Sequence, residues 1–394
     1  MVIGTGSIGT GSIGTGSIGT GPVGVGIIGA GNISDQYLSN LTTFPDVRVL
    51  AIGDILEERA KAQAEKYGVP RAGGVDTVLD DPEIDIVVNL TIPAVHVEVS
   101  EAIIAAGKHV WTEKPIGVSR EESRRLLEKA DAAGLRVGVA PDTVLGPGVQ
   151  TAKRAIARGD IGRPLFAQTT FQWSGPEIFH PNPAFLYAKG GGPLLDMGPY
   201  YVSALVHVFG PVAAVAALGL QGTPTRRVQV GELAGQEFPV EIPSTLSVLM
   251  AFEEGGQAQS IYSTDSPVIR QGIVEITGTE GTIVIPDPNT FGGAISITRP
   301  LTRLFIPPEP IQQAIVDVEQ EGVLSGRGVG LLDMARSIAA GRPHVATGEF
   351  GYHVLDTLLS IEEAAEARGF VAVESTLDQV GSIASDFDPF EATL

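Results

Sequence analysis

The pattern of apolar and polar positions divides the chain into two parts. From residue 22 to about residue 142, apolar runs alternate with stretches in which apolar residues recur every three or four positions. Such runs predict buried strands, and the wider spacing predicts amphipathic helices. We expect strands at Val23–Gly29, Val47–Asp54, Ile84–Leu90, His109–Thr112 and Leu135–Ala140, and helices at Ile33–Thr42, Leu56–Tyr67, Val95–Ala106 and after a cap at Ser119. This alternation predicts a parallel, doubly wound sheet.

Beyond residue 143 the pattern changes to apolar-polar alternation broken by turn signals, which is typical of antiparallel sheets. We expect strands at Leu165–Trp173, Val212–Leu220, Thr245–Phe252, Gln257–Ser263, Ile273–Thr277 and Thr282–Ile285. Helices are expected at Val149–Arg158, at 194–209, at Gly330–Ala340 and at Gly351–Arg368. The fold class is therefore α/β, with a Rossmann domain at 22–142 and an α+β domain at 143–394 built on a large, mostly antiparallel open sheet.

Residues 1–21 repeat the unit Gly-Thr-Gly-Ser-Ile and match the GxGxxG pattern several times. That pattern indicates a nucleotide site only between a strand and a helix, and neither flanks the repeat. We interpret residues 1–21 as a flexible, glycine-rich tail.

Composition excludes several classes of function. The 394 residues suit two domains, and the net charge of -20 argues against partners such as nucleic acid or an anionic membrane. The absence of cysteine removes disulfides, thiolate metal sites and cysteine nucleophiles, and no metal-ligand spacing appears. No apolar run is long enough to span a membrane and no secretory signal is present, so we expect a cytoplasmic protein.

A dinucleotide fingerprint lies between the first expected strand and helix. Gly29 permits the tight turn, Gly31 lets the backbone approach a pyrophosphate, and Asn32 and Ile33 begin the helix; Ser34 replaces the usual third glycine. Asp54 ends the second strand, where a carboxylate accepts hydrogen bonds from the adenosine ribose and repels a 2′-phosphate. The expected cofactor is therefore NAD, with NADP disfavoured.

Several further motifs together resemble the Gfo/Idh/MocA oxidoreductases. They are Asn89-Leu90-Thr91-Ile92-Pro93 with His96, Ala106–Val110, Glu113-Lys114-Pro115, Gly159–Gly162 and Gly190–Gly198. The resemblance implies that Thr91, Ile92, His96, Glu113 and Lys114 line the cofactor site, and that Lys114 also reaches the substrate. It further implies that the open sheet face of the second domain forms the interface of a homodimer or homotetramer.

The proton relay is the part of the chemistry that the motifs leave open. The family's Asp-x-Gly-x-His motif is matched by Asp196 and Gly198, but Tyr200 stands at the histidine position. Oxidation of a carbinol carbon needs a group that accepts the hydroxyl proton, and an ammonium such as Lys114 favours the phenolate form of a nearby tyrosine. Tyr200 is therefore one candidate relay, with Asp196 orienting a hydroxyl. His180, in a proline-flanked loop, is the other.

The function expected from these features is hydride transfer between nicotinamide and a hydroxyl or keto carbon of a sugar, polyol or glycoside. One alternative is an NAD-dependent glycoside-cleaving enzyme that oxidises its substrate transiently and uses the same lysine. Another is a non-catalytic, dinucleotide-sensing regulatory protein, which the presence of both Lys114 and Asp196 disfavours.

Overall fold

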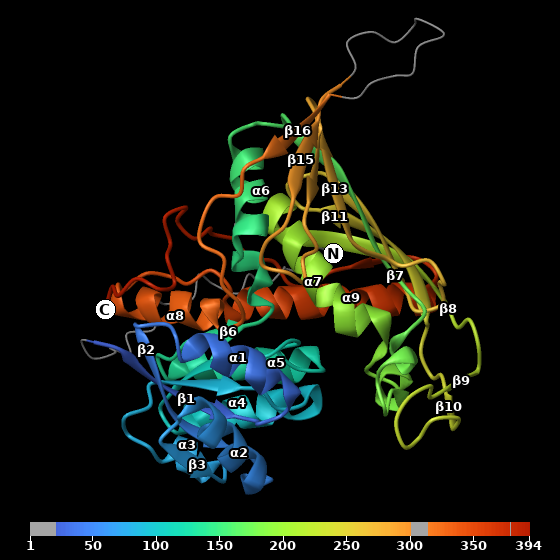
Figure 1. Ribbon diagram of the computed structural model, residues 1–394. Coiled ribbons are helices and arrows are strands. Elements are labelled where there is room, and N and C mark those ends of the chain that lie inside the picture. Colours follow the sequence, from blue (N-terminus) through green and yellow to red (C-terminus); the bar gives the residue numbers. More distant parts are fainter. Residues whose placement is uncertain (1–20, 301–313, 379) are drawn as a thin grey trace, which may run out of the picture. The chain divides into compact units, whose positions relative to one another are not determined.

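The computed structural model describes residues 21–300, 314–378 and 380–394 (Figure 1). Apart from Gly21, the expected tail therefore lies outside the described residues. The chain divides into two compact units. The first comprises the residues up to Gly146 together with Gly322–Leu355 and Val380–Leu394, and the second comprises Pro147–Glu321 and Asp356–Gln379. Two segments from beyond residue 142 thus cluster with the nucleotide-fingerprint region.

The first unit contains a six-stranded sheet in the order β3-β2-β1-β4-β5-β6, and every neighbouring pair is parallel. Its strands are β1 (Val23–Ile28), β2 (Val47–Gly53), β3 (Arg71–Gly73), β4 (Ile86–Asn89), β5 (His109–Thr112) and β6 (Val137–Val139). Its helices are α1 (Asn32–Leu41), α2 (Glu57–Tyr67), α3 (Asp76–Leu79), α4 (His96–Ala105), α5 (Arg120–Ala132) and α8 (Val329–Ala339). The predicted parallel, doubly wound sheet is confirmed; the short elements β3 and α3 were not foreseen.

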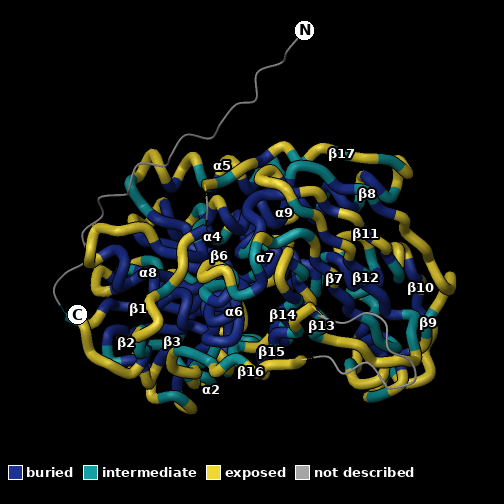
Figure 2. The backbone as a smooth tube through the Cα atoms, turned by 90° about the horizontal axis from the view of Figure 1, so that it is seen from above, coloured by how far each residue is buried: buried dark blue, intermediate teal, exposed yellow. Residues whose placement is uncertain are grey.

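Local sequence signals explain why these elements begin and end where they do. The Ser119 hydroxyl accepts a hydrogen bond from the Glu122 backbone N–H at 3.2 Å, so it caps α5 as expected. Leu38 and Leu41, one turn of α1 apart, are both fully buried. The strands themselves carry almost only buried residues, which appear dark blue in Figure 2. Burial on both faces of the sheet accounts for their continuous apolar runs.

The second unit is built on a nine-stranded sheet in the order β16-β15-β14-β13-β7-β12-β11-β8-β17. Its strands are β7 (Pro164–Gln172), β8 (Val212–Leu220), β11 (Thr245–Phe252), β12 (Gln257–Ser263), β13 (Arg270–Gly278), β14 (Thr282–Ile285), β15 (Ile295–Thr298), β16 (Ile315–Val318) and β17 (Phe370–Ala372). Among the described residues only β7 and β12 pair in parallel, so the expected large, mostly antiparallel sheet is confirmed.

Helices and a small hairpin complete this unit. They are α6 (Pro147–Ala157), α7 (Gly192–Phe209), the later part of α9 (Gly348–Ala367), and the two-stranded pair β9 (Thr225–Arg227) and β10 (Glu237–Pro239). Helix α7 packs against β7, β11 and β12, which covers one face of the large sheet. Within the described ranges, no helix combines the length and the apolar character needed to cross a bilayer.

Asp142 joins α8 to the end of the parallel sheet. It is fully buried, and its carboxylate accepts hydrogen bonds from the backbone N–H groups of Gly328 at 2.7 Å and Gly330 at 3.3 Å. Burial raises the pKa of Asp142 to about 6. The Asp142 carboxylate therefore stabilises the N-terminus of α8.

A second buried carboxylate fastens the last residues of the chain to the first unit. Asp46 is 1% exposed and accepts hydrogen bonds from Arg336 Nε at 2.7 Å, from Thr393 N at 2.8 Å and from Leu394 N at 3.0 Å. Burial opposes ionisation of Asp46, but the hydrogen bonds from Thr393, Leu394 and Arg336 outweigh it and lower its pKa. The ionised carboxylate is therefore the form that the fold selects.

Replacing Asp46 with asparagine should lower the free energy of unfolding by about 3 kcal/mol, because it leaves the Arg336 guanidinium buried without its counter-ion. A lowered pKa in the folded state means that the contribution of Asp46 is complete above about pH 4 and lost as the pH falls further. Urea denaturation of wild type and variant at pH 7 and pH 3 measures this, and their difference should shrink at pH 3. Asp35→Asn, which loosens an exposed ion pair with Lys66, is the matched control and should cost under about 1 kcal/mol.

Candidate active site

The glycine turn after β1 leaves room for a ligand at the first turn of α1. Gly29 has a φ of +104°, and a β-carbon there would lie 2.7 Å from the carbonyl group of Leu90, so only glycine fits. A β-carbon on Gly31 would meet no atom within 4 Å, so the protein itself leaves this space open. Gly31 is the N-cap of α1, whose first-turn N–H groups and dipole favour an anion. The turn therefore fits a pyrophosphate.

Ser34 shows why the third glycine of the fingerprint can be replaced. It is fully buried, and its hydroxyl donates a hydrogen bond to the Gly31 carbonyl oxygen at 2.6 Å. This bond reinforces the turn while the small side chain still permits close packing of helix and strand. Asn32 is exposed and Ile33 is half-buried beside it, so both border the open space above Gly31.

Asp54, at the end of β2, is tied to the same turn. Its Oδ2 accepts a hydrogen bond from the Ala30 backbone N–H at 2.7 Å, and its Oδ1 accepts one from the Leu56 N–H at 2.8 Å. Each carboxylate oxygen keeps a second lone pair, with which it can accept a hydrogen bond from a ribose hydroxyl group. The next residue, Ile55, is 89% exposed and offers an apolar surface beside this carboxylate. These features fit the adenosine end of a dinucleotide.

The loop after β4 lies on the other side of the glycine turn, because β1 pairs with both β2 and β4. Asn89, at the end of β4, is fully buried, and its Oδ1 accepts hydrogen bonds from the Thr91 hydroxyl at 2.6 Å and the Thr91 N–H at 3.2 Å. Ile92 follows with 66% of its surface exposed. Asn89 therefore shapes the loop that presents Thr91 and Ile92 as candidate cofactor contacts.

His96 joins the loops that follow β4 and β5. It is 1% exposed, and its ring nitrogens lie 2.7 Å from the Pro115 carbonyl oxygen and 3.0 Å from the Thr91 carbonyl oxygen. Burial lowers the pKa of His96, and the neutral ring donates one N–H, so it satisfies one of these carbonyl groups at a time. Both ring nitrogens face backbone, so His96 holds the site's loops together.

Glu113 fixes the backbone of Lys114. Its Oε1 accepts a hydrogen bond from the Tyr37 hydroxyl at 2.8 Å, and its Oε2 accepts one from the Lys114 backbone N–H at 3.0 Å. The Arg327 guanidinium lies 3.7 Å from Glu113 Oε1 and adds an ion pair from the segment before α8. Lys114 is half-buried where β5 ends, beside the loop that carries Thr91. Its position is thus set by a buried polar network.

The other two motif residues belong to α7 in the second unit. Asp196 is half-buried in the second turn of the helix, and Tyr200, one turn later, is 5% exposed. The neighbouring Tyr201 is fully buried and its hydroxyl accepts a hydrogen bond from the Gly272 N–H at 2.8 Å. Because Asp196 and Tyr200 are four residues apart, the helix places them on one side, while Tyr201 is used for packing.

His180 lies in a loop rich in aromatic rings. It is half-buried, and its Nδ1 accepts a hydrogen bond from the Asn182 N–H at 3.0 Å. Its ring centroid lies 6.4 Å from that of Phe179 and 5.4 Å from that of Phe185, and Phe179 stacks on Trp173 at 5.6 Å. Phe179 and Phe185 are 61% and 59% exposed. Exposed rings of this kind can pack against the apolar face of a ring-shaped ligand.

The described residues thus bring every predicted cofactor contact into the first unit, around the ends of β1, β2, β4 and β5. Asp196, Tyr200 and His180 lie in the second unit. Sequence reasoning gave no role to three residues that hold the cofactor loops, namely Asn89, Tyr37 and Arg327. No group of acidic or histidine side chains among the described residues is arranged to hold a metal ion.

Replacing Asp54 with asparagine should weaken discrimination against NADP by about tenfold or more, because the variant loses the charge that opposes a 2′-phosphate. Asparagine also keeps one oxygen to accept a backbone N–H, whereas alanine would disturb the glycine turn. Titration of wild type and variant with NADH and with NADPH, followed by nicotinamide fluorescence, measures the ratio of the two dissociation constants. Glu58→Gln on exposed α2 controls for general charge. Tighter binding of NADP than of NAD by the wild-type protein would contradict the assignment of Asp54.

Comparison with known proteins agrees with this geometry. A family model described as an oxidoreductase family with an NAD-binding Rossmann fold matches residues 23–140, and a model of the C-terminal domain of the same family matches residues 149–284. Among curated relatives, a trans-1,2-dihydrobenzene-1,2-diol dehydrogenase from Macaca fuscata fuscata is 26% identical over 281 residues, which cover 71% of this chain and 78% of the relative. A D-xylose dehydrogenase from Paenarthrobacter nicotinovorans is 28% identical over 240 residues, covering 58% and 61%.

Solved structures show the same fold. The apo form of a levoglucosan dehydrogenase superposes with a TM-score of 0.76 over 92% of this chain and all of its own, at 23% sequence identity. At that identity the likeness speaks for the fold alone. The two successive family models, matched over a parallel nucleotide-binding sheet and a large mixed sheet, identify this chain as a member of the Gfo/Idh/MocA family of NAD-binding oxidoreductases.

Proposed function

We propose that this protein is an NAD(H)-dependent dehydrogenase that interconverts a secondary alcohol and a ketone, or a hemiacetal and a lactone, in a sugar, polyol or related ring diol. The observation that carries the proposal is the anchoring of Lys114 beside a dinucleotide-shaped turn in the same unit. The relatives named for dihydrobenzene-diol and D-xylose share the chemistry of a hydroxyl-bearing carbon on a small ring. Bound nicotinamide would supply the hydride acceptor or donor.

The chain's own residues would supply binding, orientation and proton transfer. The Lys114 ammonium can donate a hydrogen bond to the reacting oxygen and stabilise negative charge as it develops there. Glu113 holds the Lys114 backbone, which fixes the point from which the side chain extends. Asp196 can accept a hydrogen bond from a second hydroxyl, which would favour substrates with neighbouring hydroxyls. The exposed rings of Phe179 and Phe185 suit the apolar face of a ring-shaped substrate.

Replacing Lys114 with alanine should abolish turnover while NADH binding persists, because the ammonium acts on the substrate oxygen and the glycine turn binds the dinucleotide. The loss of a charged donor at the reacting oxygen should raise the barrier by about 3 kcal/mol or more. Initial rates across a panel of sugars, inositols and glycosides test the loss of turnover, and NADH fluorescence titration tests the retained cofactor binding. Lys129→Ala, which removes an exposed lysine paired with Glu101, is the control. Loss of NADH binding in Lys114→Ala would contradict the assigned role.

Tyr200→Phe and His180→Ala distinguish the two candidate relays. If Tyr200 moves the proton, Tyr200→Phe should lower kcat about 10²-fold or more, and His180→Ala should mainly raise KM. The reverse pattern would assign the relay to His180. Rates near wild type for both variants would exclude both residues. Stopped-flow measurement of NADH formation gives the rate of the chemical step.

We further propose that the protein is a homo-oligomer, a dimer or a tetramer, formed through the face of the nine-stranded sheet that α7 leaves uncovered. Strand register puts Leu218, Leu249 and Phe166 on this face, with exposures of 64%, 52% and 43%. Exposed apolar residues of this size on one face of a sheet are typical of interfaces. Glutamine and serine side chains lie between them, as interfaces between folded subunits often have.

Replacing Leu249 with arginine should shift the wild-type oligomer toward the 41.0 kDa monomer, because it buries a charge at the centre of this face. Light scattering coupled to size-exclusion chromatography at micromolar concentration measures the mass. Val268→Arg changes another exposed apolar residue that lies outside these strands and should leave the mass unchanged. A wild-type protein that is monomeric at that concentration would contradict the proposal.

A further inference from the structure

The loop between β7 and α7 carries His180 and the aromatic rings, yet much of it has no regular structure. Two short 3-10 turns, Pro176–Ile178 and Ala184–Tyr187, are its only helical parts. Loops of this kind are held by side chains where backbone pairing is sparse. What fixes residues 173–187 therefore decides where His180 and the rings stand.

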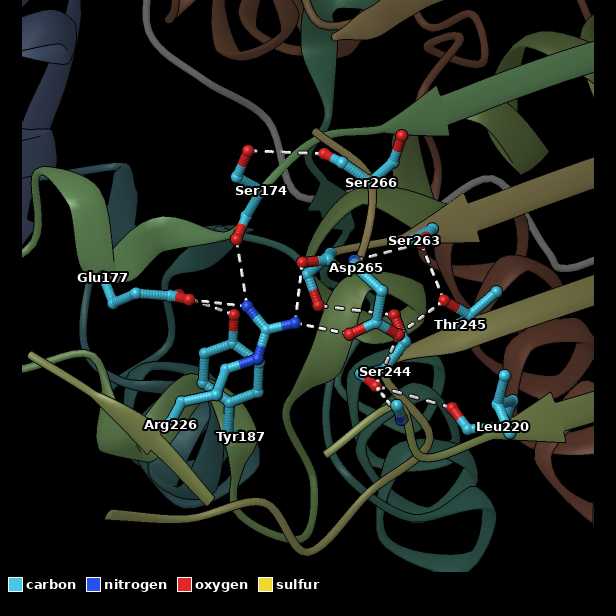
Figure 3. Close-up of polar contacts among 12 residues, drawn as sticks. Ser174, Glu177, Tyr187, Leu220, Arg226, Ser244, Thr245, Ser263, Asp265 and Ser266 are labelled. Atoms are coloured by element: carbon cyan, nitrogen blue, oxygen red, sulfur yellow. Dashed lines mark hydrogen bonds and ion pairs between the residues drawn. The ribbon is translucent and has the colours of Figure 1, made fainter. Parts of the chain in front are cut away.

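One arginine forms hydrogen bonds with several residues of this loop (Figure 3). Arg226, on β9, is 11% exposed, and its Nη1 donates hydrogen bonds to the Ser174 carbonyl oxygen at 2.9 Å and to the Glu177 carboxylate. Its Nη2 donates to the Thr264 carbonyl oxygen at 2.7 Å and to the Asp265 carboxylate. A planar guanidinium can serve four acceptors in this arrangement, and the ammonium of lysine cannot.

The far end of the loop meets the same guanidinium. Tyr187 is 1% exposed, and its hydroxyl donates a hydrogen bond to Glu177 Oε2 at 2.8 Å. The Arg226 guanidinium lies over the Tyr187 ring, 4.9 Å from the centroid. The beginning of the loop at Ser174 and Glu177 and its end at Tyr187 are therefore joined through one side chain.

Asp265 connects this cluster to the nine-stranded sheet. Its Oδ2 accepts hydrogen bonds from the Ser244 and Thr245 hydroxyl groups, each at 2.7 Å. Thr245 begins β11, and Asp265 follows the end of β12. Arg226 thus has the loop on one side and the sheet on the other.

We propose that Arg226 is a positioning residue that fixes residues 173–187, with His180 and their aromatic rings, against the large sheet. The proposal that this order serves substrate binding rests on the proposed dehydrogenase function. The fastening itself rests only on the contacts of Arg226 with Ser174, Glu177, Tyr187 and Asp265.

Trp173 reports on the loop independently of activity. The chain has two tryptophans, and the other, Trp111, is fully buried in the first unit, so acrylamide quenching of fluorescence follows mainly Trp173. The variants are Arg226→Met, Arg226→Lys and the control Arg227→Met. Arg227 is the next residue on β9 but forms only an exposed ion pair with Glu237, in which the side chains are 64% and 59% exposed.

Arg226→Met should raise the quenching constant and lower kcat/KM about tenfold or more, chiefly through KM, because a misplaced loop no longer orients the substrate. Arg226→Lys should fall between Arg226→Met and wild type, and Arg227→Met should match wild type in both measurements. A lower melting temperature for Arg226→Met with wild-type quenching and KM would reduce Arg226 to a stabilising role and overturn the proposal.

If Arg226→Met does not fold, Tyr187→Phe and Glu177→Gln replace it, since each removes one link and leaves the arginine in place. Unchanged quenching and KM in both would overturn the proposal. If wild-type protein oxidises no sugar, polyol or diol, the proposed function fails. The quenching comparison of Arg226→Met with Arg227→Met then still decides whether Arg226 orders the loop.

Discussion

Strand β1 pairs with β2 on one side and with β4 on the other, and the geometry of the nucleotide-binding unit follows from this parallel hydrogen bonding. Parallel strands present their carboxyl ends at one edge, so the Gly29 turn, Asp54 and the Thr91 loop are brought together although they are far apart in the chain. The next pairing, of β4 with β5, places Lys114 beside them. A break in the pairing of β1 would therefore disperse the cofactor contacts and Lys114 at once.

Local pattern was enough to predict this part of the fold. The strand β1, the glycine turn and α1 follow from short-range rules, namely apolar runs, turn residues and helical spacing. The helix cap at Ser119 was likewise visible in the sequence and is present in the structure. Short elements such as β3 were missed because three residues carry too little periodicity. Strands β16 and β17, of four and three residues, were missed for the same reason.

The parts of the site that could not be predicted depend on long-range contacts between polar residues. Nothing in the neighbourhood of Arg327 indicates that its side chain reaches Glu113, nor does the position of Tyr37 indicate its bond to the same carboxylate. Asp142 is a similar case. Its place after a strand suits a ligand contact, but the N–H groups of a later helix occupy it. The hydrogen-bond partners of buried polar groups are therefore determined by the fold as a whole and not by the local sequence.

The two glycines of the fingerprint respond to different constraints. A side chain at position 29 would collide with the backbone of Leu90, so the fold itself requires glycine there. A methyl group at position 31 would touch nothing in the protein. A library of variants sorted by heat resistance would therefore retain alanine at 31 and discard it at 29. Only selection for growth on the substrate would disfavour alanine at both positions. Conservation of glycine at position 31 would therefore reflect ligand binding, whereas conservation at position 29 reflects the fold.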